Sequence, residues 1–398
     1  MAIVLAFSGG LDTSFCVPYL RETYQVPVHT VTVDTGGVSE TERASLAARS
    51  KELGAESHQT LDGKQALYDR LLGFLIKGNV LRGGVYPLCV GPERVIQAEM
   101  MVDAARALGA TAVAHGSTGA GNDQVRFDTT LRLLARDLDV LTPIRSLGYS
   151  RQQSTDFLTA RGFSVSASTT TYSINKGLWG TTIGGKETHD SNEALPEEAY
   201  VDTVGPDAWP ASPEEITITF ASGHPVALDG VEMDAVSLID VLTQRAGAHG
   251  VGRGMHVGDT ILGIKGRVGF EAPAATVLIA AHRELEKLVL TRWQQFQKSQ
   301  LADFYGMLLH ESQYFDPVMR DIEAFLDASQ AVVTGTVRVR LHHGSAFVLG
   351  CNSPHSMIDT GVATYGETNA LWSAQDAEGF SKILGMQSYL AHIARTQR

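Results

Sequence analysis

The chain has 398 residues, of which 43% are hydrophobic and 19% charged, a composition typical of a globular protein and not of a disordered one. Its length exceeds what one hydrophobic core usually serves, so we expect two domains with an extension. The net charge of −12 weighs against a nucleic-acid partner, which usually requires a basic face.

The cysteines and the N-terminus indicate the compartment. Cys16, Cys89 and Cys351 lie far apart and show no metal-binding spacing, which favours buried free thiols in a reducing environment. The N-terminus shows no signal-peptide pattern, and no apolar run approaches the length of a membrane span. We therefore expect a cytoplasmic protein without a membrane or nucleic-acid partner.

The first 165 residues alternate between strand-like and helix-like segments, a pattern typical of a parallel sheet covered by helices. Predicted strands cover residues 2–7, 27–34 and 110–116. Predicted helices cover residues 13–22, 39–54, 92–109 and 149–162. Ser39 and Glu42 have the spacing of a capping box, which marks the start of the second of these helices.

Beyond residue 165 the pattern changes to that of an α+β domain. Strands are predicted at 214–220 and within 336–350, and helices at 237–247 and across 281–309. The glycine-dense stretch 249–259, which includes His249 and His256, is predicted to be a mobile loop and not a metal site. The predicted domains are 1–165, 166–370 and a C-terminal helix from 371 to 398, which we expect to contact other copies of the chain.

The segment SGGLDTS, residues 8–14, follows a buried strand and precedes a helix. Glycine N–H groups and a helix N-terminus together form an anion site, and the hydroxyl groups add donors. Because a carboxylate beside phosphates is repulsive unless a divalent cation lies between them, Asp12 is interpreted as a Mg²⁺ ligand. The alternative is a tight turn with a capping side chain and no ligand.

A second candidate segment, HGSTGAGNDQVRF at 115–127, follows the strand predicted at 110–116. It should therefore lie at the same sheet edge, where ligands bind in open α/β folds. Asn122 and Asp123 would begin a helix, with Arg126 one turn further on the same face. A helix cap with a surface ion pair would explain the same residues without a ligand.

Together these segments resemble the argininosuccinate synthase family of N-type ATP pyrophosphatases. The resemblance also involves KGNVLRGGVYPL, YSINKGLWG and GIKGRVGFEAPAAT and covers most of the chain. It implies an adenine nucleotide α-hydrolase-like domain joined to an α+β synthetase domain, in a homotetramer with exchanged C-terminal helices. The implied reaction is the ligation of citrulline and L-aspartate through a citrullyl-adenylate, consuming ATP and releasing AMP and pyrophosphate in arginine biosynthesis.

The resemblance also implies roles for individual residues. The residues expected to contact ATP are Ala6, Phe7, Ser8, Gly9, Gly10, Leu11, Asp12, Thr13, Ser14, Val33 and Gly116. The residues expected to contact aspartate are Thr118, Asn122 and Asp123. The residues expected to contact citrulline are Tyr86, Asn122, Arg126, Ser173 and Thr182. Asp12, Asp123 and Arg126 are the catalytic candidates, with Mg²⁺ on Asp12, and the sequence does not decide whether Asp123 accepts a proton or only holds the ammonium group.

Several positions depart from the family pattern on the citrulline side. Val90 and Gly91 replace hydroxyl residues, and Ala120 replaces a lysine. Gly258 aligns with a glutamate that holds citrulline, and Phe270 with a tyrosine. Losing a charge-assisted contact costs on the order of 1.5–3 kcal/mol. One hypothesis is therefore an N-acylated citrulline as substrate, and the other is compensation by Asp259 or His256.

Two further classes of protein could carry the same glycine-rich segment. A tRNA-thiolating ATP pyrophosphatase usually brings paired catalytic cysteines and a basic RNA-binding face, neither of which the sequence shows. A nucleotide-binding module without catalysis would not need a second domain, nor a second segment such as GNDQVRF at the same sheet edge.

Overall fold

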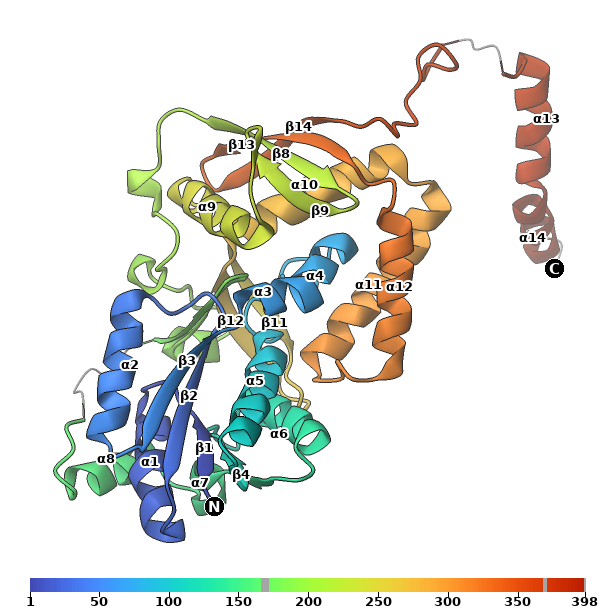
Figure 1. The fold of residues 1–398 in the computed structure, drawn as a ribbon. Coiled ribbons are helices and arrows are strands. Elements are labelled where there is room, and N and C mark those ends of the chain that lie inside the picture. The colour runs from blue at the N-terminus through green and yellow to red at the C-terminus, as the bar shows by residue number, and fades with distance from the viewer. Residues whose placement is uncertain (166–171, 368–370, 397–398) are drawn as a thin grey trace. The chain divides into compact units, whose positions relative to one another are not determined.

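The computed structural model describes residues 1–165, 172–367 and 371–396 and divides the chain into two compact units, Met1–Ser353 and Pro354–Arg398. The first unit holds one parallel and two antiparallel sheets (Figure 1). The α/β class, with its second α+β part, is confirmed. None of the described helices is long and apolar enough to cross a membrane. The boundaries predicted at residues 165 and 370 stay a proposal.

The parallel sheet has five strands in the order β3-β2-β1-β4-β5, and every neighbouring pair runs parallel. In chain order the strands are β1 (Ile3–Ala6), β2 (Val28–Asp34), β3 (Ser57–Asp62), β4 (Ala112–Ala114) and β5 (Asp139–Leu141). The predicted strands match β1, β2 and β4. Because β1 lies in the centre, its carboxyl end meets those of β2 and β4 at one edge of the sheet.

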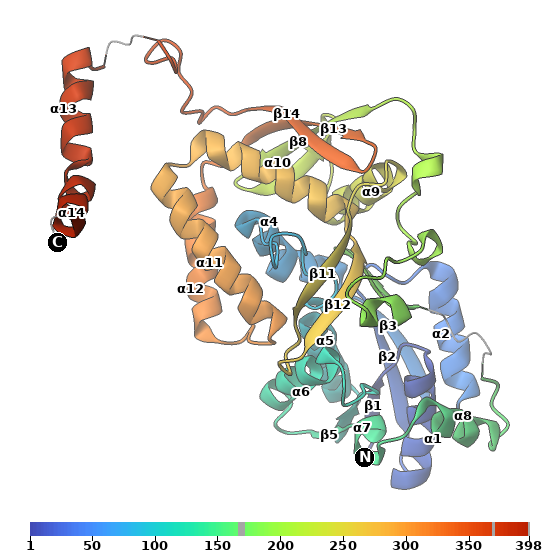
Figure 2. The ribbon, with the colours of Figure 1, turned by 180° about the vertical axis from the view of Figure 1, so that it is seen from behind.

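Helices cover both faces of this sheet (Figures 1 and 2). Ile3 and Leu5 pack against Phe15 on one face, while Val4 packs against Val102 on the other, as expected for a strand buried on both sides. The capping box of Ser39 and Glu42 is confirmed. The covering helices are α1 (Leu11–Tyr24), α2 (Glu40–Glu52), α5 (Glu93–Ala107), α6 (Asn122–Leu134), α7 (Pro143–Leu147) and α8 (Arg151–Thr159).

The remaining sheets are antiparallel. The four-stranded sheet has the order β11-β12-β7-β6 and the five-stranded sheet the order β10-β9-β8-β13-β14. The first comprises β6 (Ser173–Gly177), β7 (Gly180–Gly184), β11 (Arg253–Asp259) and β12 (Lys265–Glu271). The second comprises β8 (Glu214–Ala221), β9 (His224–Leu228), β10 (Val231–Glu232), β13 (Gly335–His342) and β14 (Ser345–Asn352).

The prediction of a mobile loop at 249–259 was wrong over most of its length, because β11 pairs with β12 from Arg253 to Asp259. The glycines that suggested a loop make room for rings instead. A side chain at Gly254 would collide with the Phe270 ring, and a Cβ at Gly258 would lie 2.5 Å from His256 Nε2. Glycine within a strand marks such a close approach.

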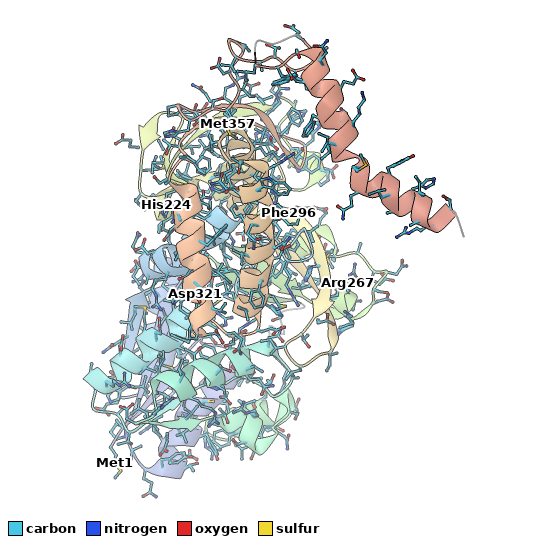
Figure 3. All side chains as sticks on the ribbon, turned by 90° about the vertical axis from the view of Figure 1, so that its right-hand side faces the viewer. Met1, His224, Arg267, Phe296, Asp321 and Met357 are labelled. Carbon is cyan, nitrogen blue, oxygen red and sulfur yellow. The ribbon has the colours of Figure 1, made fainter. Side chains whose placement is uncertain are left out.

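The helix predicted across 281–309 is two helices, so that prediction was also wrong. Leu290 adopts an extended conformation after α10 (Pro273–Val289), and Thr291 caps α11 (Arg292–His310) through a capping box with Gln294. The other long helices of this part are α9 (Ala235–Ala248) and α12 (Pro317–Gln330). Phe296 of α11, labelled in Figure 3, is 60% exposed.

One segment from the N-terminal half of the chain packs into a second hydrophobic core, which it shares with the antiparallel part of the unit. It consists of α3 (Lys64–Leu67), a π-helical turn (Tyr68–Leu72) and α4 (Gly73–Gly78). Leu67, Leu71 and Leu75 are fully buried among residues of the five-stranded antiparallel sheet and of α9 to α12. The two cores of the first unit are therefore interleaved in sequence.

The C-terminal unit carries two short helices, α13 (Ala374–Leu384) and α14 (Met386–Thr396), where the sequence predicted one. The break lies at Gly385, which ends α13. No described residue of either helix is buried. Cys16 and Cys89 are buried as predicted, whereas Cys351 is only partly buried, and all three are free thiols.

A tight contact joins the loop after β2 to the β6–β7 hairpin. The Leu178 N–H donates to the Thr35 carbonyl at 2.8 Å, and a Cβ on Gly36 would lie 2.7 Å from the Leu178 backbone. Gly36 also has a φ of 102°, in the region that favours glycine. The contact therefore requires glycine at this position for two separate reasons.

We expect Gly36→Ala to lower the free energy of unfolding by about 2–4 kcal/mol, because it combines overpacking with backbone strain. Gly148→Ala is the matched control: Gly148 has a φ of 64° but open space around it, so only strain of about 1 kcal/mol is expected. Chemical denaturation of both variants measures the difference. Equal losses would contradict the close contact with Leu178.

Candidate active site

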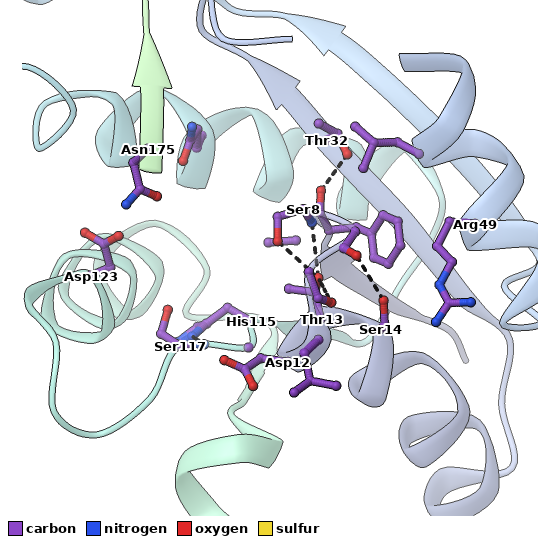
Figure 4. A pocket seen from close by; sticks show the side chains of 18 of the residues that line it. Ser8, Asp12, Thr13, Ser14, Thr32, Arg49, His115, Ser117, Asp123 and Asn175 are labelled. Carbon is purple, nitrogen blue, oxygen red and sulfur yellow. Dashed lines mark hydrogen bonds between the residues drawn. The ribbon is translucent and has the colours of Figure 1, made fainter. Parts of the chain in front are cut away.

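A cavity of about 1120 Å³ opens at the carboxyl edge of the parallel sheet (Figure 4). Its floor is made where β1, β2 and β4 end, and the β6 strand and the helices α1, α5, α6 and α8 also contribute side chains. These residues come together because parallel strands present all their carboxyl ends at one edge. The cavity is large enough for a nucleotide together with a second small molecule.

The glycine-rich loop is held by its own hydroxyl groups. Both Ser8 N and Ser8 Oγ contact Thr13 Oγ1, at 3.3 and 3.1 Å, and Ser14 Oγ donates to the Gly9 carbonyl at 3.2 Å (Figure 4). Gly9 has a φ of 71°, which a side chain would strain. Gly10 stands at the N-cap of α1 and provides no side-chain cap, so the first N–H groups of the helix are left for an anion.

Asp12 points into the cavity beside this loop (Figure 4). Burial raises its pKa above the ordinary value, and the Arg151 guanidinium only partly offsets that effect. A cation would therefore stabilise this carboxylate. Among the described residues no group of three or more His, Cys, Asp and Glu side chains could hold a metal ion. A cation at Asp12 would need further ligands, such as phosphate oxygens or water.

Asp123 lies in the first turn of α6 and is shared by two arginines, of which only Arg126 was predicted from its spacing. Arg94 Nε donates to Asp123 Oδ2 and Arg126 Nη1 to Oδ1, both at 3.0 Å. Burial alone would raise the pKa of Asp123, but the two guanidinium groups outweigh it and hold the pKa below its ordinary value. Asp123 is therefore ionised, and at 38% exposure its side chain is still accessible.

Arg126 connects the part of the unit that contains the parallel sheet to the part that contains the antiparallel sheets. Its Nε and Nη2 donate to the His310 carbonyl at 3.4 and 3.3 Å, and Nη2 donates to His310 Nδ1 at 3.2 Å. Because a guanidinium can only donate, His310 Nδ1 must be the unprotonated ring nitrogen. Burial lowers the pKa of His310 to about 3, which keeps the ring neutral. Asn122 adds a second link, accepting from Ile261 N at 2.9 Å.

Residues that the sequence assigned to ATP gather around this cavity. Each of the following lines it: Ala6, Phe7, Ser8, Gly9, Gly10, Leu11, Asp12, Thr13, Ser14, Val33 and Gly116. Asp123 lines it as well. Thr118, Asn122, Tyr86, Arg126, Ser173 and Thr182 do not, although Asn122 and Arg126 flank Asp123 on α6 and Ile174 to Lys176, which follow Ser173, are part of the wall.

Two of the positions that depart from the family pattern, Gly258 and Phe270, lie at an aromatic cluster formed by Tyr86, His256 and Phe270. Tyr86 stacks on His256 with ring centroids 5.2 Å apart and also contacts Phe270 at 5.2 Å. Gly258 leaves room for His256, as described above. Asp259, one of the two candidates for compensation, is exposed and pairs with Lys265 at 2.6 Å. It is therefore already neutralised at the surface.

Thr182 and Ser173 lie on the hairpin beside this cluster. Thr182 is buried and pairs in register with Phe270 on one side and Asn175 on the other. Ser173 is exposed and pairs with Gly184. A Cβ at Gly91 would lie 3.2 Å from Arg126 Nη2, so the missing side chain there makes space for the guanidinium.

Several cavity residues were missed from the sequence. They are Glu93, Arg94, His115, Ser117, Arg49, Arg151 and Lys176. His115 bridges the sheet edge to α6, with Nε2 2.9 Å from Asp128 Oδ1 and Nδ1 accepting from Ser117 N. The signal for Glu93 and Arg94 was their place at the start of the long predicted helix 92–109, since helix N-termini face the same sheet edge as the loops.

A parallel sheet whose central strand runs into a glycine-rich loop and an uncapped helix N-terminus, with a large cavity above, defines a nucleotide-binding α/β protein. Comparison with known proteins is more specific. Residues 2–164 match the family model for the arginosuccinate synthase N-terminal HUP domain, and residues 172–391 match that for the arginosuccinate synthase C-terminal domain. The chain belongs to the argininosuccinate synthase family.

Relatives match over nearly the whole chain. Argininosuccinate synthase of Xylella fastidiosa is 42% identical, covering 100% of this chain and 98% of its own length. That of Xanthomonas axonopodis pv. citri is also 42% identical, covering 98% and 94%. The enzyme of the archaeon Methanocaldococcus jannaschii is 37% identical, covering 99% of both chains. The resemblance drawn from the sequence motifs is confirmed at the level of the family.

The paired arginines give Asp123 a testable role in stability. Because its folded-state pKa is lowered, its contribution is present above the unfolded carboxyl pKa of about 4 and is lost as the pH falls through the folded-state value. We expect Asp123→Asn to lower the free energy of unfolding by about 1 kcal/mol at neutral pH, a modest figure because the carboxylate is partly exposed.

Urea denaturation at several pH values measures this loss, which should shrink toward pH 3. Asp137→Asn is the control, because Asp137 pairs with Arg106 at 2.8 Å on the open surface and its removal should change little. A loss for Asp123→Asn that stayed constant with pH would contradict the electrostatic explanation.

Proposed function

We propose that the chain catalyses the ATP-dependent ligation of citrulline and L-aspartate to argininosuccinate, releasing AMP and pyrophosphate, as a carbon–nitrogen ligase of arginine biosynthesis in the cytoplasm. One observation carries the proposal: the glycine-rich loop and Asp123 line the same cavity. A phosphate site and an ionised carboxylate that can hold an ammonium group lie together there. The reaction requires both ligands to meet at one place.

The chemistry explains why a nucleotide is needed. A ureido oxygen is a poor leaving group, and transfer of AMP to that oxygen makes it a good one. The N–H groups at the start of α1 and the hydroxyls of Ser8, Thr13 and Ser14 would bind the phosphates and stabilise the departing pyrophosphate. The fixed Ser8–Thr13 contacts mean that these donors are oriented before the nucleotide arrives.

The other residues would orient the two amino acids. Asp123, with Asn122 and Thr118, would hold aspartate, and Asp123 would do so as a permanent carboxylate because Arg94 and Arg126 keep it ionised. Tyr86, Arg126, Ser173 and Thr182, with Asn122, would hold citrulline. A ligand between them would bridge the nucleotide domain and the β6–β7 hairpin, excluding water from the reacting atoms.

Mg²⁺ is also proposed, with Asp12 as its protein ligand. Burial disfavours the charge on the half-buried Asp12 carboxylate, and among the described residues only Arg151 offsets this effect, so a divalent cation fits it. Mg²⁺ usually binds through one or two carboxylates together with phosphate oxygens. When bound, it would neutralise charge on the phosphates.

The other candidate functions receive no support from the comparisons. The relatives named above are all argininosuccinate synthases, which favours neither an N-acylated citrulline nor a tRNA-thiolating enzyme. Both remain useful comparators in an assay because each predicts a different acceptor.

The decisive experiment measures AMP and pyrophosphate release from MgATP with aspartate and citrulline. We expect equal amounts of AMP, pyrophosphate and argininosuccinate with citrulline, and little release when N-acetylcitrulline replaces it. Chelation by EDTA should abolish release, and excess Mg²⁺ should restore it. Release with N-acetylcitrulline but not with citrulline would contradict the proposed function. The absence of release with both compounds would contradict it as well.

A homotetramer assembled through the C-terminal helices is proposed as well. The apolar side chains exposed on α13 and α14 are Phe380, Ile383, Leu384, Met386, Tyr389 and Leu390. Amphipathic helices with this much exposed apolar surface are usually covered by a partner.

We expect Ile383→Asp combined with Leu384→Asp to reduce the mass measured by light scattering at a fixed protein concentration. Lys382→Ser, on the same helix, removes only the surface ion pair with Glu378 and should leave the mass unchanged. An unaltered mass for the double variant would show that the helix is not part of the contact between copies.

A further inference from the structure

Glu93 is a buried carboxyl group that the roles described so far do not use. It stands at the start of α5, lines the cavity and is only 2% exposed. Its Oε2 accepts from Thr35 Oγ1 at 2.9 Å, while Oε1 is buried without a hydrogen-bond partner. An unsatisfied buried carboxyl oxygen in a cavity wall is rare and costly, and it often marks a functional group.

The surroundings of Glu93 are tightly built. Oε1 lies against Gly177 of β6, where any side chain would collide with it. Gln97 Nε2 donates to Thr35 Oγ1 at 3.3 Å, and Arg94 Nη1 donates to Gln97 Oε1 at 3.0 Å. Arg94 in turn holds Asp123, so one chain of contacts links Glu93 to the carboxylate proposed to hold aspartate.

The ionisable groups that act on Glu93 have opposite effects. Burial raises the pKa of Glu93 to about 8, with smaller increases from Asp123 and Asp34, whereas Arg94 and the Thr35 hydrogen bond lower it. The phenol of Tyr86 and the thiol of Cys89 also lie within electrostatic range of the carboxylate, and burial keeps both neutral. A proton acceptor with a pKa near the working pH is well matched to its task.

Asp123 is unsuited to that task. Both of its oxygens accept from guanidinium groups, and its pKa is lowered, so it is a weak base that remains ionised. The cavity therefore holds two carboxyl groups whose pKa values are shifted in opposite directions. Such a pair separates the binding of a cation from the acceptance of a proton.

We propose that Glu93 is the general base of the second half-reaction, which takes a proton from the ammonium group of aspartate held by Asp123. This inference rests on the proposed function. Because the terminal torsion of a glutamate is broad, rotation of the carboxyl group can turn an oxygen toward the cavity.

The proton and electron balance is straightforward. The ammonium group gives one proton to the Glu93 carboxylate, which becomes a carboxylic acid, and the freed lone pair forms the new C–N bond. The bond between the ureido carbon of citrulline and the adenylated oxygen breaks, and AMP leaves with the electron pair of that bond. The nitrogen loses its second proton to the departing phosphate as the product guanidinium forms.

The test separates the two half-reactions in the full-length protein. Citrulline-dependent exchange of labelled pyrophosphate into ATP, without aspartate, reports adenylation alone. We expect Glu93→Gln to retain this exchange within about twofold and to lose about 100-fold or more in argininosuccinate formation. The rise of wild-type turnover with pH up to about 8 should be absent in the variant.

Asp103→Asn is the matched control, an exposed carboxyl-to-amide change on the same helix α5, and should leave both half-reactions unchanged. Stability provides an independent readout. Because the pKa of Glu93 is raised in the folded protein, the wild type loses stability as the pH rises from about 4 to about 8. Glu93→Gln has no such loss, so at pH 8 its melting temperature should equal or exceed that of the wild type.

Equal losses in exchange and ligation, or a lower melting temperature, would assign Glu93 a structural role and overturn the proposal. Full ligation by Glu93→Gln with an unchanged pH profile would overturn it as well. A wild-type protein that shows neither citrulline-dependent exchange nor ligation would instead refute the proposed function, so the two failures are distinguishable.

Discussion

The carboxylate of Asp123 is the point through which much of the site is connected. Its two oxygens bind guanidinium groups from α5 and α6, and one of those, on Arg126, continues to the carbonyl and ring of His310 at the end of α11. One acidic side chain therefore pairs with the charges of two helices and, through Arg126, is connected to a third helix in the other core. Removing it would leave the two largely buried guanidinium groups without their nearest counterion, so this residue of the cavity wall is also a structural one.

Close packing at two glycines, which leaves no room for a side chain, is the second constraint on the site. Gly36 lies against the backbone of Leu178, and Gly177 lies against Glu93. These contacts hold the β6–β7 hairpin on the loop after β2, so the wall of the cavity is shared between the parallel sheet and the first antiparallel sheet. A wall built this way is stiff, because neither side can move without opening a backbone contact.

The sequence predicted those features that depend on local chemistry. The Ser39 capping box, the buried strand β1 and the glycine-rich turn between β1 and α1 were correct because each is determined by a few adjacent residues. The break at Leu290 was missed although Thr291 and Gln294 carry the capping-box spacing, since the apolar pattern continues through it.

Tertiary effects explain the other differences. Glycines in β11 looked like loop residues, and only the rings of Phe270 and His256 show why a strand needs them. The start of the predicted helix 92–109 placed Glu93 near the sheet edge, but its burial and the absence of a hydrogen-bond partner for Oε1 are not properties of neighbouring residues and could not be predicted. The assignments to aspartate and citrulline contacts rest on the resemblance and stay predictions.

The segment from α3 to α4 has a consequence for how the chain is made. Its leucines are buried with β8, β13 and the helices α9 to α12, all of which follow more than a hundred residues later. At usual translation rates these partners leave the ribosome roughly ten seconds or more after the segment does. During that interval four fully buried leucines have no core to enter, so the nascent chain carries an exposed apolar helix that chaperones can recognise.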